Sequence, residues 1–168
     1  AIYRVIGGGY FEAMGMRIVR GRSFGPGDDA AAPRVAIVDE AFARREWPGE
    51  NPLGKRLHPE GMENERWEEP WYTVVGVVPS VRSGSITQDF RPTYYFDHRQ
   101  RPPYRTGSVL YAVRTGGAPE RLYAGIRQAI RAVDPEVPVV LRSMPEFVAE
   151  TVADRRFTML VLGGFGAL

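Results

Sequence analysis

The sequence of 168 residues contains no cysteine. This absence excludes disulfide bonds, thiolate nucleophiles and cysteine-ligated metals, and it is compatible with a reducing or an oxidising compartment. Histidine is scarce as well, since His58 and His98 are the two in the chain and lie far apart without the i,i+4 spacing of many metal sites. We therefore predict two surface-loop histidines and no bound metal.

A strong charge of one sign is also lacking. The 22 basic and 20 acidic side chains leave a formal net charge of +2, which gives no electrostatic reason to expect nucleic acid as a partner. Hydrophobic residues make up 43% of the chain and charged residues 25%, as in an ordinary globular protein. The length fits one domain, or two subdomains that share a core.

The common catalytic and cofactor motifs are missing. Gly7 to Gly9 lack the spacing of a dinucleotide-binding loop, and Gly54-Lys55 is followed neither by serine or threonine nor by a predicted helix. No serine lies in a Gly-x-Ser-x-Gly elbow. The acidic pairs at 28–29 and 39–40 are adjacent in sequence and do not face one another, so we assign them to a turn and a helix cap. These observations predict a protein that is not an enzyme, with no catalytic residue and no cofactor.

Runs of apolar and β-branched residues predict the strands. The run Tyr72 to Val78 is apolar on both parities, which is typical of a strand buried on both faces. The predicted strands are Ile2 to Ile6, Met16 to Val19, Arg34 to Val38, Tyr72 to Val78, Thr93 to Phe96, Ser108 to Arg114 and Val137 to Leu141.

Caps and breakers predict the helices. Asp39 is placed to cap a helix over 40–47 that Pro48 ends, and Pro119 opens a later amphipathic helix expected to pack on a sheet. A final helix begins at Ser143 or at the Met144-Pro145 step and runs into the C-terminal tail. Strands and helices alternate, so we predict an α+β fold of βαβ repeats, a sandwich of sheet and helices.

The C-terminal tail is an apolar run. Residues 157–168 carry no charge, and a membrane-spanning helix needs about 20 apolar residues. We expect 157–168 to begin a truncated transmembrane helix, and we expect Arg155, Arg156 and Phe157 to lie where the chain meets the membrane. The alternative is an amphipathic helix that closes a soluble core, but no polar residue follows Thr158.

One segment combines arginine with aromatic residues, which is a composition able to bind polyanions or to stack on rings. A packed irregular loop is the alternative interpretation, because the segment is rich in proline. The acidic loop at 60–69 is a second candidate surface. The candidate partner-binding residues of the first segment are Arg91, Tyr94, Tyr95, Arg99, Arg101, Tyr104 and Arg105.

Four segments carry a family resemblance by their order and spacing. They are Tyr10-Phe11 with Met14-Gly15-Met16, Arg20 to Phe24 (RGRSF), Val35 to Leu57 (VAIVDEAFARREWPGENPLGKRL) and Tyr72 to Arg82 (YTVVGVVPSVR). Together they resemble the MacB-like periplasmic core domain of ABC transporter permeases. The later features Val113-Arg114-Thr115, Val133-Asp134-Pro135, Ser143-Met144 and Arg155-Arg156-Phe157 are similar to the return of such domains to the membrane in FtsX-like permeases.

The resemblance implies a core domain over 1–156, with a porter-like fold and a more β-rich subdomain inserted at about 24–107. It implies a non-catalytic permease subunit of the bacterial inner membrane that carries this domain on the periplasmic or extracellular side. The implied partners are an ABC ATPase subunit or domain, a second permease subunit in a dimer, and a periplasmic adaptor or substrate protein. The implied activity is the coupling of cytoplasmic ATP hydrolysis to conformational change, for export or mechanotransmission.

Two other classes of function stay open at this point. Some FtsX-like proteins are signalling scaffolds that control a cell-wall hydrolase or another extracytoplasmic partner, and a binding assay would separate that role from transport. A soluble enzyme on a ferredoxin-like α/β core is the third interpretation. It requires a cluster of polar residues in a pocket, and the sequence offers no obvious cluster.

Overall fold

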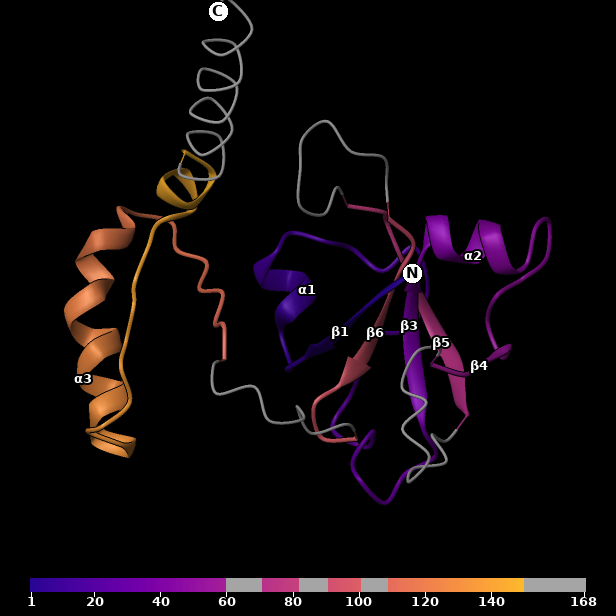
Figure 1. The fold of residues 1–168 in the computed structure, drawn as a ribbon, viewed down its shortest axis with the longest axis horizontal. Helices are drawn as coiled ribbons and strands as arrows, with labels where there is room; N and C mark the ends of the chain where they lie inside the picture. The colour runs from indigo at the N-terminus through magenta and orange to yellow at the C-terminus, as the bar shows by residue number, and fades with distance from the viewer. Residues whose placement is uncertain (60–70, 82–90, 101–108, 150–168) are drawn as a thin grey trace, which may run out of the picture. The chain divides into compact units, whose positions relative to one another are not determined.

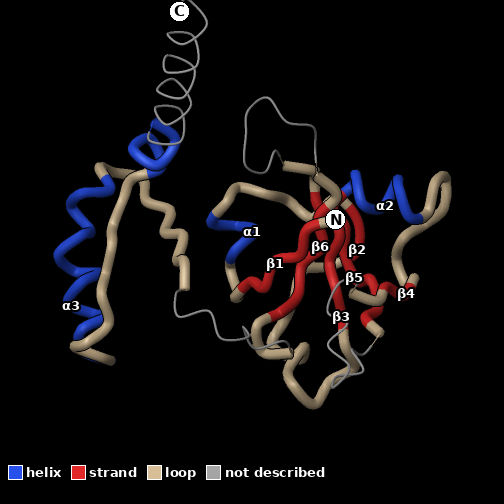
Figure 2. Tube along the Cα trace, in the orientation of Figure 1, coloured by secondary structure: helices blue, strands red, loops and turns tan. Residues whose placement is uncertain are grey.

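The computed structural model describes residues 1–59, 71–81, 91–100 and 109–149. The chain forms two compact units, Ala1–Arg114 and Thr115–Leu168, coloured along the chain in Figure 1. The first unit contains a sheet, whereas the described regular structure of the second is helical (Figure 2). The range 24–107 of the predicted inserted subdomain falls within the first unit, and its limits stay a prediction.

A mixed six-stranded sheet forms the centre of the first unit. The neighbouring strands follow the order β1-β6-β3-β5-β2, and β4 pairs with β5 as well. β1 is parallel to β6 and β3 is parallel to β5, whereas β3 and β6 are antiparallel. The strands are β1 (Ile2–Ile6), β2 (Arg20–Gly21), β3 (Val35–Asp39), β4 (Arg56–Leu57), β5 (Tyr72–Val78) and β6 (Thr93–Asp97).

The segment from β3 to β5 is a βαβ unit of the predicted kind. Helix α2 (Glu40–Glu46) follows β3 directly, and the chain then returns to β5, the parallel neighbour of β3. The predicted cap is confirmed, because the Asp39 side chain accepts a hydrogen bond from the Phe42 backbone N–H at 2.7 Å. Pro48 follows the helix closely and prevents its continuation.

A bulge in β5 brings β2 very close. The register between β3 and β5 shifts at Val75, and the Val75 carbonyl accepts a hydrogen bond from the Arg22 backbone N–H at 2.9 Å. A Cβ atom on Gly21, whose φ is +74°, would lie 2.2 Å from the Val75 oxygen, and one on Gly76 would lie 2.3 Å from the Arg22 oxygen. The crossing therefore requires glycine at both positions. The strand predicted at 16–19 is wrong, since the pairing residues of β2 begin at Arg20.

Side chains of the sheet are buried on both faces. Tyr94 and Phe96 of β6 enter the core beside α2, whereas Tyr95 enters the core beside α1 (Tyr10–Ala13), and the two helices flank the sheet in Figure 1. This alternation follows from the strand period of two. The α2-side core contains Ala36, Val38, Phe42, Leu57, Tyr72, Val74, Val77, Tyr94 and Phe96. The α1-side core contains Ile6, Phe11, Met16, Ile37, Val78 and Tyr95.

The second unit contains a short 3-10 turn, η1 (Pro119–Leu122), and the helix α3 (Tyr123–Val133). Residues 144–149 are helical as well. The strands predicted at 108–114 and 137–141 are wrong in the described residues, because 109–114 and 137–141 form no strand pairing. A β-strand needs a neighbour for its backbone hydrogen bonds, and neither segment has one among these residues. The α3 side chains Ile126 and Ile130 are half-buried, and no α3 residue is fully buried.

The predicted membrane segment cannot be placed on this structure. Residues 155–157 and the apolar run 157–168 lie outside the described residues. Within the described ranges, no helix is both long enough and apolar enough to span a bilayer.

Candidate functional site

The predicted partner-binding segment divides between the core, the surface and the part of the chain that is not described. Tyr94 and Tyr95 lie in β6 and are 6% and 0% exposed, so they are core side chains rather than contacts available to a partner. The ring of Tyr94 packs edge-on against Phe42, and that of Tyr95 against Phe11. Arg91 is exposed just before β6. The residues outside the described ranges are Arg101, Tyr104 and Arg105.

Arg99 is the centre of a clamp at the C-terminal end of β6. Its Nε lies 3.0 Å from Oδ1 of Asp97 and its Nη2 lies 2.6 Å from Oδ2 of the same residue. The guanidinium also donates hydrogen bonds to the carbonyl oxygens of Gly25 at 2.7 Å and Pro26 at 3.2 Å. We call these four residues the Arg99 clamp. It ties the end of β6 to a loop more than 70 residues earlier in the chain.

The carboxyl group of Asp97 stays charged inside the clamp. Asp97 is 1% exposed, and burial by itself acts to raise its pKa. The hydrogen bonds and the positive charge of Arg99 outweigh burial, so the pKa of Asp97 is lowered from its ordinary value. A bidentate guanidinium–carboxylate pair is both strong and geometrically specific. The clamp therefore positions the loop that contains Gly25 and Pro26. The guanidinium of Arg99, which was predicted to bind a partner, is occupied by these contacts within the domain.

Gln100 joins the same loop to the sheet through its amide group. Its Oε1 accepts a hydrogen bond from the Val35 backbone N–H at 2.9 Å. Its Nε2 donates to the carbonyl oxygens of Asp29 at 3.1 Å and Pro33 at 3.0 Å. The guanidinium of Arg34 donates to the Gln100 carbonyl. Gln100 is 3% exposed, so these bonds satisfy an amide that would otherwise be buried at a cost.

A second ion pair closes the loop from its other end. Nη1 and Nη2 of Arg22 lie 2.6 and 2.8 Å from Oδ2 and Oδ1 of Asp28. The Gly25 backbone N–H donates to Oδ2 of Asp28 at 2.7 Å. Hydrogen bonding from Arg22 is the main reason that the pKa of Asp28 is lowered. The pair joins residues six positions apart in a loop, where no periodic or capping motif of the sequence indicates it.

The two acidic pairs have the structural roles predicted for them. Oδ1 of Asp29 accepts hydrogen bonds from the backbone N–H groups of residues 31 and 32, at 2.9 and 3.1 Å, which is a turn. Asp39 is 0% exposed, and burial raises the pKa of its carboxyl although hydrogen bonds from Phe42, Thr93 and Ser80 act against that rise.

The histidines lie in separate places in the first unit. Nδ1 of His98 is 3.4 Å from Oδ1 of Asp97, and its side chain is half exposed. The ring of His58 lies 5.3 Å from that of Trp71, over which the Arg56 guanidinium lies at 5.2 Å. In the described part of the chain, no three His, Asp or Glu side chains converge on a point where a metal could bind.

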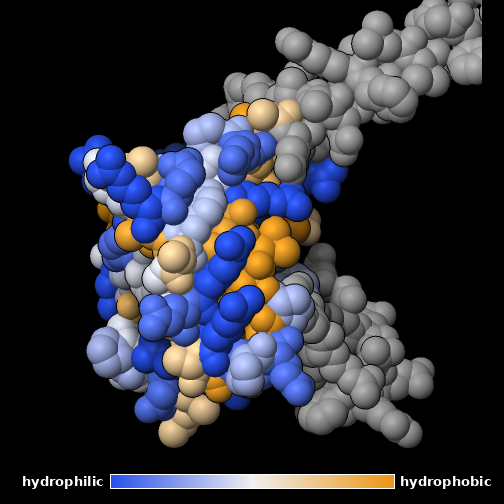
Figure 3. Space-filling model, turned by 90° about the vertical axis from the view of Figure 1, so that its left-hand side faces the viewer, coloured by the Kyte–Doolittle hydropathy of each residue, from blue (hydrophilic) through white to orange (hydrophobic). Residues whose placement is uncertain are grey.

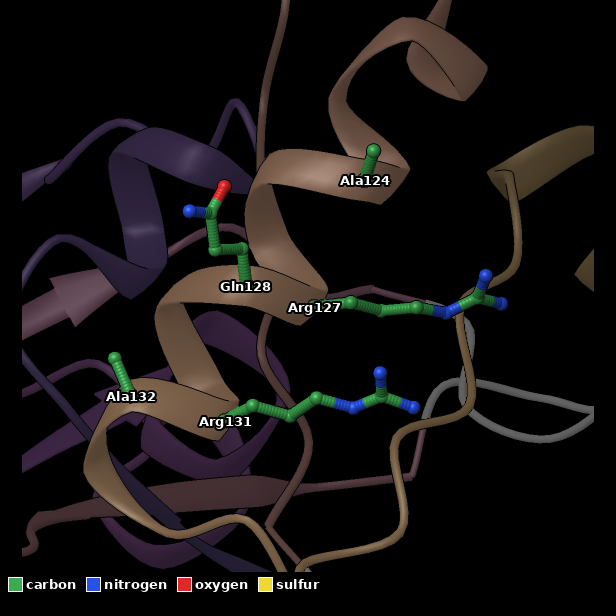
Figure 4. Close-up of a pocket in the computed structure, with 5 residues that line it drawn as sticks. All are labelled: Ala124, Arg127, Gln128, Arg131 and Ala132. Carbon is green, nitrogen blue, oxygen red and sulfur yellow. The ribbon is translucent and has the colours of Figure 1, made fainter.

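A shallow hollow lies on α3 among the described residues of the second unit. Arg127 and Arg131 extend side by side, away from Gln128 (Figure 4). One helix supplies all five lining residues, so the hollow is an open surface rather than an enclosed site. Hydrophilic side chains predominate on the face seen in Figure 3, and an apolar patch is exposed among them. The residues of the hollow are Ala124, Arg127, Gln128, Arg131 and Ala132.

The start of the final helix carries a capping box that sequence analysis did not find. Ser143 donates its backbone N–H to Oε2 of Glu146 at 2.8 Å, and the Glu146 backbone N–H donates to Oγ of Ser143 at 3.4 Å. The order Ser-x-x-Glu before an apolar run is a recognisable signal for this reciprocal cap. The sequence prediction placed a helix start at Ser143 or at the Met144-Pro145 step, but it did not include Glu146 as the second half of the cap.

Comparison with known proteins gives the following matches. The profile of a family described as the MacB-like periplasmic core domain matches residues 2–129. The periplasmic region of MacB from Actinobacillus actinomycetemcomitans is similar in structure, with a TM-score of 0.54 and 18% identity, over 78% of this chain and 56% of that chain. The chain thus spans just over half of that structure. No curated protein sequence matches the chain.

Two further solved structures are more distant. The extracellular domain of the noncanonic ABC-type transporter YknZ from Gram-positive bacteria has a TM-score of 0.41 and 20% identity, over 56% of this chain and 42% of that chain. A permease-protein domain from Porphyromonas gingivalis has a TM-score of 0.45 and 16% identity, over 83% and 67%. The likeness of fold therefore rests on the first structure.

Proposed function

The chain belongs to the MacB-like periplasmic core domain family, and on this basis we propose that it is the extracytoplasmic domain of an ABC transporter permease subunit. In this proposal it couples ATP hydrolysis in the cytoplasm to conformational change outside the membrane, for export or mechanotransmission. The observation that carries the proposal is the family match over residues 2–129. The fold shared with the periplasmic region of MacB supports it.

The first unit has the packing expected of a rigid body, which moves as a whole without changing its internal structure. Its sheet is buried on both faces, and the Arg99 clamp and the Arg22–Asp28 pair hold its longest described loop. Packed cores resist continuous deformation and move as units. We propose that the domain transmits force and performs no chemistry, and that ATP hydrolysis belongs to a separate nucleotide-binding subunit or domain.

The proposed partners follow from that role. They are the ABC ATPase, a second permease subunit in a dimer, and a periplasmic adaptor or a substrate protein. We propose a location in the bacterial inner membrane with this domain on the outer side, and we propose that Arg155, Arg156 and Phe157 begin the return to the bilayer. For partner contact we propose the exposed Arg91. Arg101, Tyr104 and Arg105 lie outside the described residues and stay candidates.

The test is a measurement of ATP turnover and domain movement in the same sample. The full permease would be purified with its ATPase in lipid nanodiscs, and the exposed Arg17 would be replaced by cysteine for a fluorescent label. The chain itself contains no cysteine, so labelling at this position is specific within the domain. We expect the label signal to change when ATP binds and to return after hydrolysis. A label signal that is identical in all nucleotide states would contradict the proposal.

The same preparation distinguishes a signalling scaffold from a transporter. A scaffold that regulates a cell-wall hydrolase would show the nucleotide-dependent label signal and would also stimulate the hydrolase on purified peptidoglycan. An exporter would show the label signal without that stimulation.

A further inference from the structure

The exposed face of α3 carries two arginines and no carboxylate. Arg127 and Arg131 are four positions apart, are both exposed, and extend side by side (Figure 4). The helix itself contains no acidic residue, and neither arginine forms an ion pair with a described residue. Like charges at this spacing destabilise a helix, and no interaction within α3 offsets their repulsion.

Several arginines of the first unit are held in internal contacts. Arg22 is paired with Asp28, and Arg99 is paired with Asp97. The side chain of Arg114 donates a hydrogen bond to a backbone carbonyl of the same unit at 2.8 Å. Those guanidinium groups are occupied, whereas the two on α3 remain available to a ligand.

The helix dipole accounts for one of the two positions at most. Arg131 lies in the last turn of α3, where a positive charge interacts favourably with the helix dipole. Arg127 lies one turn earlier, where this effect has fallen off. An anionic ligand that contacts both side chains would account for the pair.

The surface around the arginines is too open for a small ligand. One helix supplies all the residues of the hollow, whereas small-molecule sites enclose most of the surface of their ligand. Ala124 and Ala132 also line the hollow and are exposed, so that a second polypeptide can approach the backbone of α3 closely. The shape therefore favours a macromolecule that lies along the helix.

The apolar side of α3 argues against a lipid surface as that macromolecule. A helix that binds a membrane surface buries its apolar face among the lipids. Ile126 and Ile130, the central apolar residues of α3, are already half-buried within the protein. They are not available for insertion into a bilayer, so the observations favour a protein with negative charge.

The spacing of the arginines indicates the secondary structure of such a partner. Four residues of α-helix rise by about 6 Å, and carboxylates four positions apart on a second helix repeat at the same distance. A β-strand is a poorer partner, because the backbone N–H groups inside a helix are already bonded and cannot pair with it. An acidic helix therefore matches the two guanidinium groups.

We propose that this surface, which we call the α3 arginine face (Ala124, Arg127, Gln128, Arg131 and Ala132), binds an acidic helix of a partner protein that carries Asp or Glu at positions i and i+4. Each guanidinium would contact one carboxylate through charge-assisted hydrogen bonds. This inference deepens the proposed function and rests on it for the statement that the partner is extracytoplasmic.

The experiment is a titration of the full permease, with its ATPase in phosphatidylcholine nanodiscs, with synthetic helical peptides. Each peptide is rich in alanine, has about 20 residues and carries one fluorine label. The matched peptide has two glutamates four positions apart. The mis-spaced peptide has the same composition with the glutamates two positions apart, on different sides of the helix. A third peptide has two lysines four positions apart. Binding is measured as broadening of the fluorine NMR resonance, which detects weak complexes.

The variants change the charge of the face. Arg127→Glu with Arg131→Glu reverses it, and Arg127→Gln with Arg131→Gln removes it. Arg17→Glu with Arg44→Glu is the matched control, because it changes the net charge equally at two exposed arginines of the first unit. Amide hydrogen exchange over residues 124–133 shows whether α3 stays folded in each variant.

We expect the wild type to bind the matched peptide about five-fold more tightly than the mis-spaced peptide, as for two exposed ion pairs. Salt at about 0.5 M should remove this difference, and so should the glutamine variant. The reversed variant should prefer the lysine peptide to the matched peptide, which unfolding of α3 could not produce. The control variant should behave as the wild type.

Three outcomes would overturn the acidic-helix partner. The first is equal binding of the matched and mis-spaced peptides to the wild type, and the second is a reversed variant that still prefers glutamate. The third is loss of the preference for the matched peptide when phosphatidylglycerol is added to the nanodiscs, which would show that lipid headgroups occupy the face.

The proposed function is tested separately by the label signal at position 17, measured without peptide. If that signal responds to ATP but the matched peptide is not preferred, the α3 arginine face is wrong and the proposed function stands. If the signal does not respond while the reversed variant exchanges its preference, the proposed function is wrong and the face still binds an acidic helix.

Discussion

In the unit Ala1–Arg114, a sheet is buried on both faces, whereas in the described part of the unit that begins at Thr115, Ser143 alone is buried. The first unit combines apolar burial with buried ion pairs at Asp28 and Asp97. The second depends on helix caps and on the half-buried stripe of α3. Large free energies of unfolding come from apolar burial, so the first unit should be the more stable.

The two units should respond differently to force. A packed core opens only in a cooperative transition, whereas an element with few buried contacts opens locally at a small cost in free energy. Under the proposed function, the stable unit is the body that is moved, and the second unit contains the part that adjusts. Four predictions test this comparison, beginning with the largest expected effect.

The largest loss is expected at the glycine crossing of the first unit. Gly21→Ala should lower the free energy of unfolding by about 4 kcal/mol or more, because the new Cβ would lie 2.2 Å from the Val75 oxygen. Gly49→Ala is the control, since Gly49 has a similar φ of +76° but no atom within 4 Å of the added Cβ. It should cost about 1–2 kcal/mol from backbone strain alone. Equal losses in urea unfolding would show that contact at the crossing is unimportant.

The next prediction compares one apolar side chain from each unit. Phe96→Ala should cost about 3–5 kcal/mol, because Phe96 is 0% exposed and its ring centroid lies 4.2 Å from that of Tyr72. Ile126→Ala on α3 should cost about 1 kcal/mol, as expected for a half-buried side chain. Thermal unfolding measures both. A loss at Ile126 as large as that at Phe96 would mean that the apolar stripe of α3 is fully covered in the protein.

A third prediction concerns pH. The pKa values of Asp28 and Asp97 are lowered in the folded protein, so their contribution to stability is complete above the unfolded value of about 4. It is lost as the pH falls from there through the folded pKa values. Asp97→Asn should cost about 2 kcal/mol at pH 7 and much less near pH 2. A constant loss across that range, measured by urea unfolding at each pH, would contradict the charged clamp.

Asp39 provides the matched control, because its pKa is shifted in the opposite direction to that of Asp97. Its pKa is raised by burial, so this carboxyl disfavours the folded state when it is charged and the penalty disappears as the pH falls through the raised pKa. Asp39→Asn retains an acceptor for the Phe42 N–H. We therefore expect this substitution to be close to neutral at pH 7, in contrast to Asp97→Asn.

The smallest effect is expected at the cap of the final helix. Ser143→Ala should lower the stability of that helix start by about 1 kcal/mol, while Ser143→Thr should retain most of it. Amide hydrogen exchange at residues 147–149 should become about five-fold faster in the alanine variant. The amides of β3 and β5 should be unaffected. Faster exchange throughout the first unit would show that the two units do not open independently.

Local patterns predicted the elements whose sequence signal is itself local. The apolar run at 72–78, the β-branched run ending at Val38 and the Asp39 cap were each found within one residue of the structure. The strands predicted at 108–114 and 137–141 are wrong in the described residues, although both segments are rich in apolar residues. Strand formation depends on a neighbouring strand, and a segment's own composition does not supply one.

The candidate site was predicted less well than the fold. Composition grouped Tyr94, Tyr95 and Arg99 as one exposed surface, but strand alternation in β6 buries the two tyrosines on opposite faces. Arg99 meets Asp97 within its own segment, yet its other partners lie near Gly25. Long-range hydrogen bonds of this kind leave no pattern in a single sequence.

The sequence by itself determined the family, the central strands, the cap of α2 and the absence of cysteine chemistry, because these depend on residue type, order and short spacing. Only the tertiary structure decided that Arg99 also binds the carbonyl oxygens of Gly25 and Pro26, and why Gly21 and Gly76 are required. The physical reason is distance along the chain. Contacts between residues more than 50 positions apart form only when strands have already fixed the backbone around them.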